Sequence, residues 1–269
     1  MDVIVSSANA LYKQLHKLTE SARERRQQGV AWLDGEHLLE MALQAEFSIE
    51  RLLLAENAFD GLGSRWRERL PAVPANCFSD SLFRQLAPVE TPSGIAALVR
   101  IDPSHEIQGR DFWVLLENLQ DPGNLGTILR TAAAAGVTDV WLSRGCVDAW
   151  SPKVLRAGMG AHFLLTLHAG VELPQVIRQF PGKTLAATLD GSDDLFAADL
   201  TGPCAFVFGN EGAGLTAELS GLAKWRVRIP MPGKMESLNA AAAAAICLYE
   251  HVRQDALAKT EHSLSGLSK

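Results

Sequence analysis

The residues best suited to chemistry stand in two stretches toward the C-terminal end of this 269-residue chain. The first, residues 209–214, reads Gly-Asn-Glu-Gly-Ala-Gly and follows the apolar run Phe206–Phe208. Its three glycines allow sharp turns and a close approach of the backbone to a ligand. The second carries Ser237 and Asn239, two residue types that commonly cap helices, ahead of the alanines at 240–245. Each stretch alone is also typical of a strand, a turn and a helix in any α/β protein.

A third stretch, residues 118–136, is expected to form a turn and a helix. A Pro-Gly pair at 122–123 favours a turn, and the helix is predicted to begin near Asn124 and to end at Gly136. The free N–H groups at the start of such a helix suit an anion such as a phosphate. Asn124 and Arg130 are six residues apart, so they lie within about 120° of each other around the helix. A capping role for Asn124 and a surface role for Arg130 are the structural alternatives.

Apolar segments that alternate with helical patterns must position these stretches. Continuous apolar runs are typical of strands buried in a parallel sheet, and their alternation with helices predicts an α/β fold. The predicted strands are Phe112–Leu116, Val140–Leu142, Phe163–Leu167, Leu185–Leu189, Phe206–Phe208 and Val227–Met231. A helix is predicted over Leu173–Phe180. The run at 185–189 ends in an Asp-Gly pair at 190–191, and strand ends of this kind bind ligands in open sheets.

The chain is long enough for two domains with separate cores. We expect a small α/β domain, a linker, a larger α/β domain and a flexible tail, over residues 1–103, 104–110, 111–255 and 256–269. In the small domain, the predicted elements include strands at Val3–Val5, Val30–Leu33 and Ile95–Val99 and a helix that ends near Arg26. No catalytic constellation is apparent there.

The composition excludes several classes of protein. Hydrophobic residues make up 47% of the chain and charged residues 21%, which is typical of a globular protein. The longest apolar run, Ala240–Tyr249, is too short to span a membrane, and the N-terminus lacks the features of a signal peptide. The cysteines lack metal-ligand spacing and indicate a reduced, cytoplasmic protein with no metal site; they are Cys77, Cys146, Cys204 and Cys247.

The net charge of −6 counts mildly against nucleic-acid binding, because contacts to phosphates need Lys and Arg. Binding to nucleic acid depends more on local patches of positive charge than on the net charge of the protein. Basic clusters, each equally consistent with a solvated face, lie at 13–17, 23–26, 65–69 and 224–228.

Motifs of other nucleotide-binding α/β proteins are missing. A dinucleotide-binding domain needs Gly-x-Gly-x-x-Gly after its first strand, and a P-loop needs Gly-x-x-x-x-Gly-Lys followed by Ser or Thr. The pair of glycines at 123 and 126 lacks the first spacing, and the second motif does not occur. These two classes are therefore disfavoured.

Taken together, the three stretches resemble the three signature motifs of the SpoU–TrmH family of RNA ribose 2′-O-methyltransferases, in the family's order. The resemblance is close over about residues 110–252. It is looser over 1–105, where the chain is similar to the L30e-like substrate-binding domain of many members. Two departures from the family pattern occur. Gly158 stands where many relatives carry Ser, and residues 32–36 read Trp-Leu-Asp-Gly-Glu where the family often has an aromatic residue and Val-Glu-Gly-Glu.

The resemblance implies the SPOUT fold for residues 111–255. This is a parallel α/β sheet whose C-terminal chain threads a loop to form a deep trefoil knot. Knots are rare, and no periodicity in a sequence reveals one. The resemblance also implies a homodimer, for which the small side chains at 132–135 and 240–245 would allow close helix packing.

The resemblance further implies S-adenosylmethionine as the cofactor, held largely by backbone groups of three loops. The positions that match the family's cofactor contacts are Thr188, Leu189, Gly191, Gly209, Asn210, Gly212, Ile229, Met231 and Leu238. Those that match its functional residues are Asn124, Arg130, Glu211, Ser237 and Asn239. No metal is implied.

The implied reaction is transfer of a methyl group to a ribose 2′-hydroxyl of structured RNA. The family proposal gives removal of the hydroxyl proton to the residue that Arg130 matches. A guanidinium is a poor base, so anchoring an RNA phosphate stays open as its role. Ribosomal RNA is the expected substrate, because the first domain resembles those of ribosomal-RNA enzymes. The alternatives are transfer RNA and a non-catalytic RNA-binding or assembly role on the same fold.

Overall fold

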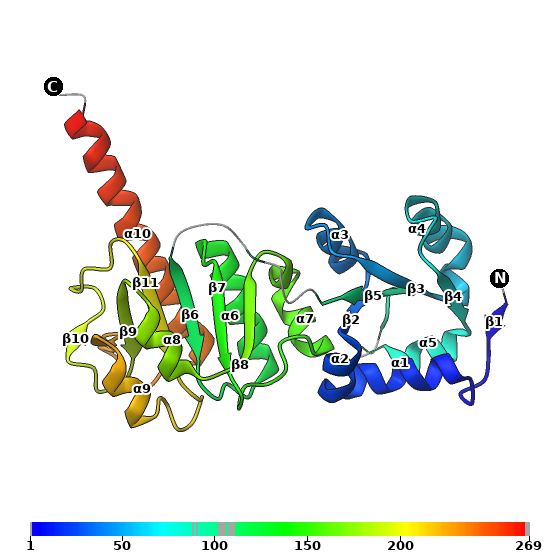
Figure 1. Cartoon of the computed structure of the whole chain (residues 1–269), viewed down its shortest axis with the longest axis horizontal. Helices are drawn as coiled ribbons and strands as arrows, with labels where there is room; N and C mark the ends of the chain where they lie inside the picture. The colour runs from blue at the N-terminus through cyan, green and yellow to red at the C-terminus, as the bar shows by residue number, and fades with distance from the viewer. Residues whose placement is uncertain (1, 88, 90, 102–105, 107–110, 267–269) are drawn as a thin grey trace. The chain divides into compact units, whose positions relative to one another are not determined.

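The computed structural model describes residues 2–87, 89, 91–101, 106 and 111–266, with side chains up to residue 260. The chain divides into two compact units (Figure 1), residues 1–105 with 148–163 and residues 106–147 with 164–269. The predicted linker, residues 104–110, lies outside the described residues except for Glu106.

The first unit is built on a five-stranded mixed sheet with the order β1-β4-β3-β5-β2. β4 is parallel to β1 and β3, whereas β5 runs antiparallel to β3 and β2. The strands are β1 Val3–Ile4, β2 Val30–Asp34, β3 Ile49–Ala55, β4 Ala75–Phe78 and β5 Ile95–Arg100. The prediction of a small α/β domain is confirmed.

Helices cover the two faces of this sheet through separate apolar clusters. Successive side chains of a strand point to opposite faces, so Leu54 packs with α3, α4 and α7, whereas Leu53 packs with α1 and α5. The helices are α1 Ala10–Glu20, α2 Ala22–Gln28, α3 Glu36–Gln44, α4 Ser64–Arg69, α5 Asp80–Leu86 and α7 Pro152–Gly158.

The helix that was predicted to end near Arg26 is two helices, α1 and α2. Ser21 separates them with an extended backbone, φ −112° and ψ 114°. Its hydroxyl oxygen accepts a hydrogen bond from the N–H of Glu24 and so caps α2. Gly29 ends α2 in the left-handed conformation, φ +64°, which favours glycine.

A buried ion pair holds residues 148–163 within the first unit, although the sequence had assigned them to the larger domain. Arg25 is 3% exposed, and its Nε and Nη2 atoms lie 2.7 and 2.6 Å from Oδ2 of Asp148. Its Nη1 donates to the carbonyl oxygens of Leu18 and Thr19, so every guanidinium nitrogen has a partner. Arg25 therefore serves the fold and is not part of an exposed basic cluster.

The second unit is built on a seven-stranded sheet in which all neighbouring strands are parallel, in the order β10-β12-β9-β11-β6-β7-β8. This confirms the predicted parallel α/β sheet. The strands are β6 Phe112–Leu116, β7 Asp139–Ser143, β8 Thr166–Val171, β9 Lys183–Ala187, β10 Asp193–Asp194, β11 Cys204–Phe208 and β12 Trp225–Arg228.

Helices lie on both faces of this sheet as well. Leu115 and Val207 share an apolar cluster with α8 and α9. Phe112, on the same strand as Leu115, faces the other side of the sheet, where the centroid of its ring lies 4.1 Å from that of His251 in α10. α10 in turn packs against α6. These helices are α6 Pro122–Ala135, α8 Leu173–Gln179, α9 Ala217–Leu222 and α10 Ala240–Gly266.

The structure also departs from the predicted elements of the second unit. β9 begins and ends two residues before the predicted strand Leu185–Leu189, and β12 begins two residues and ends three residues before the predicted strand Val227–Met231. The strand predicted from Phe163 is wrong at its start, because residues 161–163 form a 3₁₀ turn and β8 begins at Thr166. β10 and α9 were not predicted. The flexible tail expected from residue 256 is instead helical as far as Gly266, in keeping with its Ala, Leu, Lys and Glu content. Within the described part of the chain, no helix is long and apolar enough to cross a membrane.

His162 is a buried histidine in the first unit whose charge state should affect folding. Its side chain is fully buried, with Nε2 2.8 Å from the carbonyl oxygen of Ala149. Nδ1 has no hydrogen-bond partner among the described residues. Burial lowers the pKa of His162 from 6.5 to about 4, against smaller opposing effects of the Ala149 carbonyl and the Asp148 charge. The folded protein therefore holds the imidazole neutral, with Nε2–H as the donor.

Between pH 6.5 and about 4 the unfolded chain binds a proton at this position and the folded chain does not, so stability should fall as the pH falls. We expect the His162 contribution to cost about 2 kcal/mol of unfolding free energy at pH 5 relative to pH 7. Urea unfolding at both pH values would measure it, and His162→Gln should remove this part of the loss. Equal losses in the wild type and the variant would contradict the assignment.

Candidate active site

A cavity of about 810 Å³ lies in the second unit, lined by the loops that follow β9, β11 and β12. Its volume is in the range of ordinary ligand pockets. These loops converge because the carboxyl ends of parallel strands lie at one edge of a sheet. Most of the cofactor positions expected from the resemblance line the cavity, namely Thr188, Leu189, Gly209, Asn210, Gly212, Ile229, Met231 and Leu238.

Two of the predicted glycines are required by close backbone packing. A Cβ atom on Gly209 would overlap the backbone of Gly214 and Leu215. Gly191 does not line the cavity. A Cβ atom there would lie 2.6 Å from the carbonyl carbon of Val227, so the loop after β9 packs directly on β12.

Asn210 shapes the glycine turn with both ends of its side chain. Its Oδ1 accepts hydrogen bonds from the N–H groups of Gly212 and Ala213, each at 2.9 Å. Its Nδ2 donates to the carbonyl oxygen of Asn118 at 2.8 Å. Asn118 itself has a left-handed backbone, φ +52°. The amide of Asn210 is thus committed to the backbone, and a contact with a ligand would come from its main chain.

Glu211 connects the glycine turn to the loop that precedes α6. Its carboxylate accepts hydrogen bonds from the N–H of Asp121 at 2.9 Å, the N–H of Gln120 at 3.2 Å and Nδ2 of Asn124 at 3.2 Å. Partial burial raises the pKa of Glu211, but these hydrogen bonds and that of its own backbone N–H outweigh it and leave the pKa below the ordinary value. The carboxylate is therefore ionised and acts as an acceptor.

Asn239 connects the same network to α10. Its Nδ2 donates to Oδ1 of Asn124 at 2.9 Å. Its Oδ1 accepts from the N–H groups of Ala241 and Ala242, at 2.9 and 3.3 Å, and so caps the helix. A continuous chain of hydrogen bonds, Glu211–Asn124–Asn239, thus joins the three motifs found in the sequence.

The other two predicted functional residues are not in this chain of hydrogen bonds. Ser237 is exposed and lines the cavity. Arg130 is exposed on α6, lines no part of the cavity, and forms no hydrogen bond or ion pair with any residue that the structure describes. Its guanidinium is consequently available to a molecule from outside.

Glu117 is a residue of the site that the sequence analysis missed. It lies directly after β6 and is 7% exposed. Its carboxylate accepts hydrogen bonds from the N–H and the hydroxyl of Thr216, at 2.8 and 2.9 Å, and so fixes the end of the glycine turn. The feature of the sequence that could have identified Glu117 is its position, as an acidic residue directly after a predicted buried strand.

Comparison with known protein families identifies a separate family model for each of the two parts of the chain. The model of the SpoU rRNA Methylase family matches residues 111–249. The model of the MRM3-like substrate binding domain matches residues 9–97.

Relatives of similar length share both parts. The chain is 37% identical to an uncharacterized tRNA/rRNA methyltransferase of Synechocystis, over 96% of each chain. It is 31% identical to the 23S rRNA (guanosine(2553)-2′-O)-methyltransferase RlmP of Bacillus subtilis, over 94% of this chain and 100% of that one. The crystal structure of an AdoMet-bound rRNA methyltransferase from Sinorhizobium meliloti superposes with a TM-score of 0.81 at 27% identity, covering 94% of this chain and 97% of that one.

Gly209→Ala should damage the cavity, because the added methyl group would displace the backbone of the glycine turn. We expect the affinity for S-adenosylmethionine, measured by calorimetry, to fall at least about tenfold, or 1.4 kcal/mol. Gly233→Ala is the matched control, since a Cβ atom there meets no atom within 4 Å. Equal affinity in the two variants would show that the turn does not shape the binding site.

Proposed function

Because this chain belongs to the SpoU rRNA methylase family, we propose that it transfers a methyl group from S-adenosylmethionine to a ribose 2′-hydroxyl of ribosomal RNA. The observation that carries the proposal is the chain of hydrogen bonds Glu211–Asn124–Asn239, which joins the three motifs at one cavity. Relatives of similar length named as rRNA methyltransferases support ribosomal RNA as the substrate.

The lining of the cavity fits S-adenosylmethionine. Gly209 and Gly212 offer backbone groups that no side chain screens, and Leu189, Ile229 and Leu238 offer apolar surface for a purine ring. When bound, the cofactor supplies a methyl group activated by a sulfonium charge. The AdoMet-bound relative from Sinorhizobium supports the same ligand here.

Arg130 is proposed to anchor an RNA phosphate beside the reacting ribose. Its exposed guanidinium has no partner among the described residues, and it can bind a phosphate bidentately. A guanidinium stays protonated at neutral pH, so this role is favoured over removal of the hydroxyl proton. Anchoring would align the 2′-hydroxyl for attack, which is a large part of what an enzyme can contribute to such a transfer.

The first unit is proposed to hold the RNA, as the match to a substrate-binding model supports. Two sets of its cations differ in their partners. Arg65 and Arg69 pair with Glu36 and Glu40. The second group is exposed on α1 and α2 without a partner in the described part of the chain: Lys13, Lys17, Arg23 and Arg26. Unpaired cations can neutralise phosphates, so this face suits RNA despite the negative net charge of the protein.

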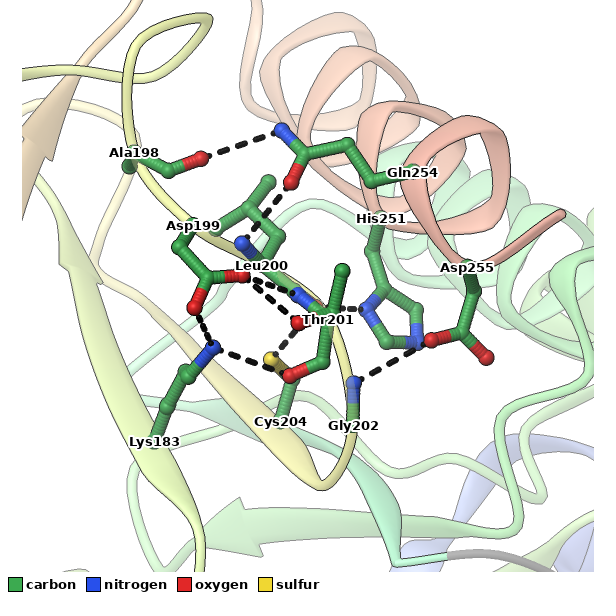
Figure 2. Close-up of polar contacts among 10 residues, drawn as sticks. All are labelled: Lys183, Ala198, Asp199, Leu200, Thr201, Gly202, Cys204, His251, Gln254 and Asp255. Carbon is green, nitrogen blue, oxygen red and sulfur yellow. Dashed lines mark hydrogen bonds and ion pairs between the residues drawn. The ribbon is translucent and has the colours of Figure 1, made fainter. Parts of the chain in front are cut away.

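A trefoil knot is proposed from the strand order. β12 lies between β9 and β10 although it follows both in the sequence, so the connection from β9 through β10 to β11 reaches across β12. Figure 2 shows this connection fastened to α10. The N–H groups of Leu200 and Gly202 donate to Gln254 and Asp255, at 2.9 and 3.1 Å, and Nδ1 of His251 lies 2.6 Å from the carbonyl oxygen of Leu200. The connection between β9 and β11 thus crosses β12 and is hydrogen-bonded to α10. This arrangement supports a knot in which the C-terminal segment passes through the loop formed by that connection.

A homodimer with a shared site is proposed as well. Arg130 does not line the cavity of its own chain. Two apolar side chains of α10, Tyr249 and Leu257, are 50% and 53% exposed. Pairing of two such helices would cover these side chains, and the cavity of the partner protomer is where Arg130 is proposed to act. Sedimentation as a monomer at micromolar concentration would contradict this arrangement.

A cytoplasmic location is proposed from the state of the cysteines. Cys77, Cys146, Cys204 and Cys247 are all free thiols. Burial raises the pKa of Cys204 and of Cys247 to about 12, which keeps both in the unreactive thiol form. Such buried thiols are typical of proteins kept in a reducing compartment.

Arg130→Ala is expected to lower methyl transfer at least about 100-fold, the scale for removal of an acid–base or positioning group. The affinity for S-adenosylmethionine should change less than about twofold, because Arg130 lines no part of the cavity of its own chain and is proposed to bind the RNA, not the cofactor. Transfer of labelled methyl to separated ribosomal and transfer RNA that lack the modification would measure the first, and calorimetry the second. Arg144→Ala is the matched control, since Arg144 is an exposed arginine paired with Glu172.

Label in ribosomal RNA, at one alkali-resistant position, is the expected result. Label in transfer RNA alone would support the transfer-RNA alternative. Absence of both label and cofactor binding would contradict the enzymatic proposal and leave an RNA-binding role. Full activity of Arg130→Ala would contradict the role given to that residue.

A further inference from the structure

Two charged side chains of the cofactor cavity, Asp190 and Arg226, have no partner within the described part of the chain. Asp190 lies in the loop after β9 and Arg226 lies in β12; both line the cavity and both are exposed. Neither side chain forms a hydrogen bond or an ion pair there, with the other or with any other residue. This free pair, Asp190 and Arg226, offers one anion and one cation to a ligand.

The other charged side chains of the described lining are each engaged with a neighbour. Oδ2 of Asp193 accepts a hydrogen bond from the hydroxyl of Ser192 at 2.9 Å. Nζ of Lys224 donates to the carbonyl oxygen of Gly182 at 2.7 Å. Glu211 is held by the loop that precedes α6. The free pair therefore differs from these side chains in having its charged groups available.

The free pair comes from two segments that touch. The N–H of Thr188 donates to the carbonyl oxygen of Val227 at 3.0 Å. Gly191, the residue after Asp190, packs so closely on β12 that an added Cβ atom would lie 2.9 Å from the carbonyl oxygen of Arg226. The two charged residues are thus neighbours in the fold, yet they form no ion pair with each other. A ligand that carries a positive and a negative group close together can satisfy both.

The amino-acid end of S-adenosylmethionine carries this pair of charges. Its α-ammonium and α-carboxylate are attached to one carbon atom. A guanidinium can bind a carboxylate with two parallel hydrogen bonds, and an ammonium can donate up to three hydrogen bonds, which carboxylate oxygens accept. An RNA phosphate fits less well, because it would satisfy Arg226 but would be repelled by the like charge of Asp190. The free pair therefore favours the cofactor over the RNA.

We propose that the free pair binds the amino-acid end of S-adenosylmethionine, with Arg226 donating to the α-carboxylate and Asp190 accepting from the α-ammonium. The inference rests on the proposed function in taking S-adenosylmethionine as the ligand of this cavity. It adds two side-chain contacts to a site whose other expected contacts come largely from the backbone. These contacts would distinguish the cofactor from adenosine compounds that lack an amino acid.

Calorimetry on the full chain with S-adenosylhomocysteine and two of its analogues tests the proposal. One analogue lacks the carboxylate and the other lacks the amino group. Arg226→Ala should weaken binding of S-adenosylhomocysteine and of the deaminated analogue about tenfold each, because both keep the carboxylate and hydrogen bonds to a charged group are lost. The affinity for the decarboxylated analogue should change less than about twofold.

Asp190→Ala should give the complementary pattern. Binding of S-adenosylhomocysteine and of the decarboxylated analogue should weaken about tenfold, because both keep the ammonium, and the affinity for the deaminated analogue should hold. Lys224→Ala and Asp193→Ala are the matched controls, since each removes the same charge from the same cavity at an engaged side chain. Each control should change the three affinities by one common factor.

The pattern across the three ligands decides the assignment. Equal losses for all of them in Arg226→Ala or in Asp190→Ala would place that residue at the adenosine part and overturn the proposal. Unchanged affinities in Arg226→Ala, with weaker binding of ribosomal RNA, would assign this cation to the RNA and also overturn it. Retained binding of an unaffected analogue shows that each variant is folded.

The outcome is separable from that of the proposed methyl transfer, because S-adenosylhomocysteine binds without RNA. Losses that follow the carboxylate and the ammonium, in a protein that methylates no RNA, would uphold the free pair and contradict the proposed function. Methyl transfer by a protein with equal losses for the three ligands would do the reverse. Absence of S-adenosylhomocysteine binding to the unaltered chain would overturn both.

Discussion

The carboxylate of Glu211 is the interaction on which the arrangement of the site depends. It lies in the turn after β11 and accepts hydrogen bonds from the loop after β6, which is about 90 positions earlier in the chain. Through Asn124 the same network reaches Asn239 at the start of α10. The network can form because β6 and β11 are neighbours in a parallel sheet, so their carboxyl ends meet at one edge.

This network divides the motif residues into two kinds. Asn124, Asn210, Glu211 and Asn239 have their side-chain groups engaged with one another or with the backbone, so they shape the cavity. Glu117 supports the end of the same turn through its two hydrogen bonds with Thr216. Arg130 and Ser237 remain exposed and unengaged, and they are the residues available to a substrate. The motifs thus combine groups that build the site with groups that are proposed to meet the RNA.

Local patterns in the sequence predicted much of the second unit. β6 was predicted at its observed bounds, and Gly136 ends α6 in a left-handed conformation as expected. What failed depends on contacts between distant residues. Arg25 and Asp148 are 123 positions apart, so neither the burial of Arg25 nor the attachment of residues 148–163 to the first unit was visible in the sequence. β10 has two residues, too few for any periodicity.

The most direct test of this account is a double-mutant cycle on Glu211 and Asn239, which touch only through Asn124. Calorimetry would give the free energy of S-adenosylmethionine binding for Glu211→Ala, Asn239→Ala and the double variant. We predict a coupling of about 1 kcal/mol, with the second substitution costing less once the first has broken the chain of hydrogen bonds. Additive losses would mean that the two residues act independently, and would contradict a site held together by this network.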